Sequence, residues 1–97
     1  IWQSTHVTVG YDSDVEQVRT LLTDAAAQHP RVLKEPGPSA SLVAFEADGL
    51  AFTLGFWISD PENSRMNVLS EVNIAILTAL RSHQIEIPFP QRVIHQR

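Results

Sequence analysis

The chain has no cysteine, no long apolar run and few basic residues, and each absence excludes a class of protein. Without cysteine there is no disulfide framework and no thiolate chemistry, which fits a reducing compartment. The longest apolar run, from Leu50 to Ile58, is interrupted by Thr53 and Gly55. It is far shorter than the roughly 18 residues that a membrane-spanning helix needs. The chain also does not begin with the charged and then apolar segments of a targeting peptide.

Charge argues against nucleic acid or an anionic membrane surface as a partner. The chain has 11 acidic and 7 basic residues, a net charge of −4, and no Lys or Arg lies between Glu35 and Arg65. Proteins that bind such polyanions carry a basic patch instead. A hydrophobic content of 43% and a charged content of 19% over 97 residues predict one soluble domain, residues 1–97, with a modest core.

The first half of the chain predicts a strand followed by a helix. The stretch from Thr5 to Val9 alternates polar and apolar side chains, so we expect a strand over about 5–10 with Val7 and Val9 inward. Ser13, with Glu16 three residues later, predicts a capping box for a helix over about 14–28. The apolar stripe of that helix has helical period and comprises Val15, Val18, Leu21, Leu22, Ala25 and Ala26.

The middle of the chain predicts a hairpin with strands over about 41–47 and 50–58. Asp48-Gly49 is a strong signal for a two-residue turn, because both residues tolerate positive φ. This turn places Phe45 opposite Phe52 and, by the same register, Val43 opposite Leu54. The expected core face comprises Val43, Phe45, Leu50, Phe52, Leu54, Phe56 and Ile58. The opposite face comprises Leu42, Ala44, Glu46, Ala51, Thr53, Gly55 and Trp57.

A second helix and a last strand are expected after the hairpin. The helix should cover about 62–83, with Asp60-Pro61 and Asn63-Ser64 as two open possibilities for its start. Its apolar face comprises Leu69, Val72, Ile76, Ala79 and Leu80, and Ile74 lies off that stripe. Residues 85–91 alternate apolar with polar or proline, which predicts a strand. Pro88 and Pro90 are two residues apart, so both lack an N–H on the same side, as at a sheet edge.

The order strand, helix, strand, strand, helix, strand predicts the fold. Two right-handed crossovers joined by a hairpin give the ferredoxin-like βαββαβ arrangement of the α+β class. It has one four-stranded antiparallel sheet with both helices on one face, the first and third strands being central. The edge position that the prolines require for the last strand agrees with this topology.

Few residues predict chemistry. The four histidines, His6, His29, His83 and His95, are not spaced as metal ligands. Carboxylates crowd the start of the first helix at Asp12, Asp14 and Glu16, where a cation site or an acid–base pair competes with simple capping of the helix. Capping explains all three, and no nucleophile or oxyanion donor accompanies them. We therefore expect no enzyme activity, no metal and no cofactor.

RNA binding is the alternative that the strand order raises. RNA-recognition modules share this order and stack bases on aromatic residues of the third strand, where this chain has Phe52 and Phe56. Those modules also need basic residues beside the aromatics, which are missing here, and both phenylalanines belong to the expected core face. Trp57, on the other face, is the aromatic expected to be exposed, and packing against another domain or subunit is its expected role.

Four segments in this order resemble one family: Gly10–Val18, His29–Leu33, Phe56–Pro61 and Ile85–Arg92. The chain is similar to the cytosolic carboxyl-terminal α/β domain of the small-conductance mechanosensitive channel family. Two short segments depart from the family's pattern. His83-Gln84 replaces a turn that often has alanine and glycine, and Val93-Ile94-His95 stands where an acidic residue is common.

The resemblance implies a non-catalytic vestibule and assembly domain. Seven copies would form a cytosolic vestibule below a bacterial inner-membrane channel that opens under membrane tension and releases solutes on hypo-osmotic shock. The membrane spans would then lie upstream of Ile1, and a barrel strand would largely lie beyond Arg97. The isolated domain is expected to be a monomer or to associate weakly. The competing hypothesis is a free-standing ferredoxin-like module for a small ligand or RNA, and the sequence upstream of Ile1 discriminates between the two.

Apolar residues outside the core pattern are the candidates for subunit contacts. Leu42, Trp57 and Ile74 meet this description, because each is apolar at a position where solvation alone favours a polar side chain. We expect all three to be substantially exposed in the isolated chain.

Overall fold

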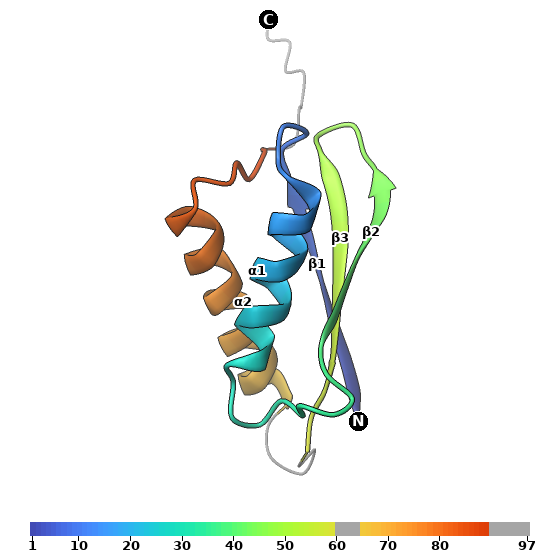
Figure 1. Cartoon of the computed structure of the whole chain (residues 1–97), viewed down its shortest axis with the longest axis vertical. Coiled ribbons are helices and arrows are strands. Elements are labelled where there is room, and N and C mark those ends of the chain that lie inside the picture. Colours follow the sequence, from blue (N-terminus) through green and yellow to red (C-terminus); the bar gives the residue numbers. More distant parts are fainter. Residues whose placement is uncertain (60–64, 90–97) are drawn as a thin grey trace, which may run out of the picture.

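The computed structural model describes residues 1–59 and 65–89 and contains three strands and two helices. Their order is β1 (Trp2–Val9), α1 (Val15–Ala27), β2 (Ser39–Phe45), β3 (Leu50–Trp57) and α2 (Arg65–Ser82). The strands form one antiparallel sheet in the order β1-β3-β2. Both described helices cover one face of this sheet, and neither lies on the other face (Figure 1). The α+β class and the helices on one face are therefore confirmed.

β1 pairs with β3 over its whole length and begins earlier than predicted. Ile1 and Ile58 exchange backbone hydrogen bonds of 3.2 and 2.8 Å, which extends the ladder beyond Trp2. The indole of Trp2 lies over Gly55, where an added Cβ would come within 2.5 Å of the ring. Val9 is fully buried and Val7 packs against the core. The inward positions of β1 are therefore as expected, although its start is not.

The predicted register of the hairpin is wrong on its β2 side. Phe45 pairs with Leu50 rather than with Phe52, and a register shift leaves Val43 as the extra residue of a bulge. The connection spans four residues and is closed by the Glu46 N–H, which donates to the Gly49 carbonyl at 2.9 Å. As a result Val43 and Phe45 are 56% and 76% exposed, not core.

Tertiary contacts of this connection explain the longer loop. The Tyr11 hydroxyl donates to the carbonyl of Glu46. Gly49 lies so close to β1 that an added Cβ would be 2.2 Å from the carbonyl oxygen of Val9. These contacts bring the tip of the hairpin against the end of β1. The β3 side follows the prediction, since its expected core residues are all buried: Leu50, Phe52, Leu54, Phe56 and Ile58.

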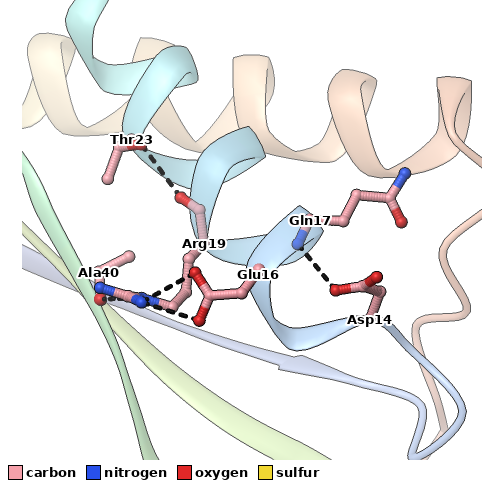
Figure 2. A network of polar contacts seen from close by, with 6 residues as sticks. All are labelled: Asp14, Glu16, Gln17, Arg19, Thr23 and Ala40. Carbon is pink, nitrogen blue, oxygen red and sulfur yellow. Dashed lines mark hydrogen bonds and ion pairs between the residues drawn. The ribbon is translucent and has the colours of Figure 1, made fainter.

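Asp14, not Ser13, caps α1. Its carboxylate accepts the backbone N–H of Gln17 at 3.1 Å. Glu16 does not complete a capping box but forms an ion pair with Arg19 at 3.0 Å. The same guanidinium donates to the carbonyl of Ala40 on β2 at 3.0 Å (Figure 2). The predicted capping box of Ser13 and Glu16 is therefore wrong, whereas the capping expected of the acidic residues is confirmed for Asp14. Arg19 joins the helix to the sheet.

α2 presents the apolar face that its sequence predicts. Val72, Ile76 and Leu80 are buried, together with Val68. Ile74 is 61% exposed, as its place off the stripe indicates. The helix is described from Arg65, so both predicted starting points lie outside the described residues.

The predicted fourth strand is not seen in the described part of the chain. Residues 85–89 form no strand, and residues 90 and 91 lie outside the described range. α2 ends in a Schellman motif: the N–H of Ile85 donates to Leu80 and that of Gln84 to Arg81 (2.9 and 3.1 Å), with Gln84 at φ 59°. The Ile85 N–H, expected in a ladder, therefore closes the helix.

One bond links the following segment to β1. The Gly10 N–H donates to the Glu86 carbonyl at 2.8 Å. This contact lies at the end of the strand, and residues 83–89 cross from the end of α2 to that end of β1 (Figure 1). The ferredoxin-like topology with four strands is therefore not confirmed.

Candidate functional site

The described histidines make structural contacts and do not converge. His29, at the end of α1, pairs with Glu71 of α2 through Nε2. Its Nδ1 accepts the backbone N–H of Arg31 at 3.1 Å, so Nε2 carries the proton and donates to the carboxylate. His6 bonds to the Thr53 hydroxyl on the sheet. Within residues 1–59 and 65–89, no three His, Asp or Glu side chains are arranged to hold a metal ion.

Two of the acidic residues at the start of α1, Asp12 and Asp14, border a cleft of about 420 Å³. Nine residues line it: Gly10, Asp12, Ser13, Asp14, Gln17, His83, Gln84, Ile85 and Glu86. Asp14 is occupied by its capping bond to Gln17. His83 bonds through Nδ1 to the carbonyl of Ala79 in its own helix. The cleft thus brings carboxylates to the N-terminal end of α1, where Asp14 acts as the cap of the helix.

The aromatic residues that RNA stacking would need are not accessible. Phe52 and Phe56 are fully buried beneath the helices. The exposed aromatics of the sheet are Trp57, 38% exposed, and its register partner Trp2, 50% exposed. Both lie on the helix-free face, because cross-strand partners share a face. This face carries hydroxyl side chains, His6 and the two indoles, and its aromatic pair offers a packing surface.

A second apolar surface lies on α2. A groove of about 340 Å³ is lined by Met66, Leu69, Ser70, Asn73, Ile74 and Leu77. Asn73 fixes one side of the helix against the sheet, since its Oδ1 accepts the Thr5 hydroxyl at 2.8 Å. The groove continues toward the edge of β1, where Asn73 and Leu77 also line a smaller cavity of about 230 Å³. α2 therefore has an apolar side toward β1 in addition to its core face.

The three candidate subunit contacts do not meet in one place. Trp57 lies on the helix-free face of the sheet and Ile74 in the α2 groove, and both are exposed as expected. Leu42 is half-buried and packs against the core. Its expected exposure is wrong because the bulge at Val43 shifts the register and places Leu42 opposite Phe52.

Sequence reasoning missed other members of these surfaces. Met66 is 71% and Leu77 is 37% exposed, and both share the groove with Ile74. Their signal was present, because positions 66, 70, 73, 74 and 77 follow helical spacing on one side of a helix. Val43 and Phe45, which the sequence pattern places in the core, are exposed instead.

None of the described helices is long and apolar enough to cross a membrane.

Comparison with known proteins gives a consistent result. The sequence profile of a family described as "Mechanosensitive ion channel MscS, C-terminal" matches residues 4–87. The chain is 37% identical over 87 residues to the mechanosensitive channel MscK of Escherichia coli, covering 90% of this chain and 8% of that protein. It is 33% identical over 81 residues to the small-conductance mechanosensitive channel of Helicobacter pylori, covering 84% of this chain and 29% of that protein.

A solved structure agrees with this match. The crystal structure of Helicobacter pylori MscS in its closed state superposes with a TM-score of 0.85 at 29% identity. The match covers 100% of this chain and 38% of that one. The chain therefore spans less than half of the relatives that it resembles.

Proposed function

Because the chain belongs to the MscS family of mechanosensitive ion channels, we propose that it is the vestibule and assembly domain of such a channel. In this proposal the domain lies on the cytosolic side of a bacterial inner membrane and has no catalytic role. The channel that contains it opens under membrane tension and releases solutes on hypo-osmotic shock. Membrane attachment comes from segments upstream of Ile1.

One observation carries the proposal: the family profile spans residues 4–87, almost the whole described chain. The superposition on Helicobacter pylori MscS over the full chain supports it independently of any short motif. The distribution of side chains agrees, because the described surface offers apolar contact areas.

The proposal includes a homo-oligomer, a heptamer by analogy with the family. Trp57 and Ile74 remain proposed subunit contacts, since both are apolar and exposed. Leu42 contributes only through the exposed part of its half-buried side chain. Neighbouring subunits that cover Trp57 and Ile74 would remove apolar surface from water, which favours assembly.

Expression of the full-length protein in a bacterial strain without its own mechanosensitive channels tests the function. We expect survival and solute efflux after a hypo-osmotic shift, and tension-gated currents in excised membrane patches. The matched variant is Phe52→Ala, which should reduce all three by destabilising this domain. A full-length protein that reaches the membrane but gives no tension-gated current would contradict the proposal.

The alternative of a nucleic-acid module is not favoured by any observation. Phe52 and Phe56 are buried, and no Lys or Arg lies between Glu35 and Arg65. A filter assay with single-stranded RNA at physiological salt should therefore show no tight binding. A submicromolar affinity would revive the alternative.

A further inference from the structure

The groove on α2 is uncharged and lies at one flank of the molecule. Met66 and Ile74, which border it, are 71% and 61% exposed. No residue that lines it is ionisable, although the chain has a net charge of −4. A second acidic copy can therefore approach this groove without meeting a like charge from its lining.

The opposite flank carries a projecting apolar pair. Val43 and Phe45 of β2 are 56% and 76% exposed. β2 and β1 are the two edges of the sheet, with β3 between them. α2 packs against β1 and not against β2, which is covered by α1. α2 and β2, which carry the groove and the projecting pair, therefore lie at opposite sides of the sheet's width (Figure 1).

The two surfaces also lie at about the same level along the strands. Leu77 of the groove and Val7 of β1 line a common cavity. Val7 pairs with Phe52, which pairs in turn with Leu42. Val43 is the next residue after Leu42. The row of paired residues Val7, Phe52 and Leu42 therefore runs across the sheet from the side of the groove to the side of Val43.

We propose that Val43 and Phe45 of each copy dock into the α2 groove of the next copy. The inference rests on the proposed function, because a closed ring of identical chains with one kind of contact needs two different surfaces on every chain. A second copy is the occupant that fits, since a single chain supplies both surfaces, on opposite flanks and at a common level. That placement is what rotation about one axis requires.

Cysteine cross-linking in membranes tests the contact in the full-length channel. This chain contains no cysteine, and any cysteine upstream is replaced by serine. The double variant Val43→Cys with Ile74→Cys is treated with a short bifunctional maleimide. We expect a ladder of covalent multimers from the double variant and none from either single variant. The matched control combines Ile74→Cys with Thr20→Cys, an exposed position on α1, and should give no ladder.

Two results would overturn the inference. A ladder from Trp57→Cys with Ile74→Cys, without one from the Val43 pair, means that the groove receives the helix-free sheet face. An oligomer on native gels that gives no Val43–Ile74 product overturns this contact and leaves the proposed function intact. If native gels show monomers only, the proposed function fails together with the inference.

A charge-pair rescue gives a second, independent readout. Ile74→Glu should reduce the oligomeric fraction on native gels, because it puts a carboxylate into an apolar contact. Adding Val43→Lys to the same chain should restore that fraction, since the introduced lysine of one copy would face the introduced glutamate of the next. The pair Thr20→Lys with Ile74→Glu is the control and should not be restored. A Val43→Lys/Ile74→Glu variant no better than Ile74→Glu alone would overturn the pairing.

Discussion

At the β2 edge of the sheet, the bulge at Val43 interrupts the ladder and Arg19 of α1 holds the carbonyl of Ala40 at 3.0 Å. Among the residues that the structure describes, neither device is seen at the β1 edge. Ile1 and Ile58 exchange both of their backbone hydrogen bonds. The backbone N–H and C=O groups of the odd-numbered residues of β1 therefore point toward β3, and those of the even-numbered residues point away from the sheet. Among the described residues, only the Gly10 N–H finds a backbone partner on that side, in Glu86.

The two edges of the sheet therefore differ in how they are protected from pairing with another strand. Edge strands are commonly blunted by charges, prolines or bulges, because their free N–H and C=O groups can recruit another strand. β1 contains no Lys, Arg, Asp, Glu or Pro in its eight residues. Within residues 1–59 and 65–89, the β2 edge is thus protected by a bulge and by Arg19, whereas the β1 edge is protected at one end only. Variants that act on the shared centre, on the hairpin tip and on each side of β1 test this comparison.

The largest effect is expected at the centre that both edges share. Phe52→Ala removes a fully buried ring from β3 and should lower the free energy of unfolding by about 3–5 kcal/mol. Phe45→Ala, on the exposed part of β2, is the matched control and should cost less than about 0.5 kcal/mol. Denaturant unfolding measures both. Equal losses would mean that Phe45 is as buried as Phe52.

The hairpin tip should be the next most sensitive region. Gly49→Ala would place a Cβ 2.2 Å from the Val9 carbonyl oxygen, a backbone atom that cannot move alone. We expect a loss of about 1–3 kcal/mol in thermal or denaturant unfolding. The control is Gly10→Ala, whose Cβ would come within 2.6 Å of the Glu86 carboxylate, which can rotate away, and within 3.1 Å of the Glu86 Cβ, a milder contact than that of Gly49 with a backbone oxygen. The prediction fails if the two alanine variants are equally stable.

Proline substitution distinguishes the two sides of β1. Thr5→Pro removes an N–H that faces β3, whereas His6→Pro removes one that faces the open side. Each variant also loses one exposed side-chain hydrogen bond, so the pair is well matched. Thr5→Pro should be less stable than His6→Pro by about 1–3 kcal/mol, the cost of an unmade backbone bond. A His6→Pro variant as unstable as Thr5→Pro would show that the outer edge is paired.

The smallest effect is expected where the chain leaves α2 for the β1 edge. Gln84 has φ 59°, and a left-handed conformation costs a non-glycine residue roughly 1–2 kcal/mol. Gln84→Gly should therefore raise stability, by about 0.5–1 kcal/mol once the greater freedom of glycine in the unfolded chain is subtracted. Gln84→Ala keeps the Cβ and should not raise it. A Gln84→Gly variant less stable than the parent would contradict the left-handed conformation of Gln84 in the Schellman motif.

The elements that could be predicted from sequence are those governed by local periodicity. The burial of β3 and of the core face of α2 follows directly from apolar spacing. The register of β2 could not be read in this way, because Asp48-Gly49 signals a two-residue turn. The observed turn is longer, with four residues. It is accompanied by contacts from distant parts of the chain, those of Tyr11 with Glu46 and of Val9 with Gly49.

Local periodicity also fails to predict the fate of residues 85–89 and part of the exposed apolar surface. Ile85 fits a strand pattern, but its N–H is taken by the end of α2, a competition that alternation does not reveal. Ile74 is evident in the sequence because it departs from the apolar stripe, whereas Met66 and Leu77 join it only when a whole side of the helix is compared. Phe45 was missed because it depends on the register of β2.

The positions of the two tryptophans have an optical consequence. Trp2 and Trp57 are the only tryptophans of the chain, and they are register partners on the helix-free face of the sheet. The buried core contains phenylalanine and aliphatic side chains but no indole among the described residues. Tryptophan emission therefore reports the surroundings of this one face. A blue shift on assembly would mean that a neighbour covers it, and unchanged emission would mean that it stays open to water.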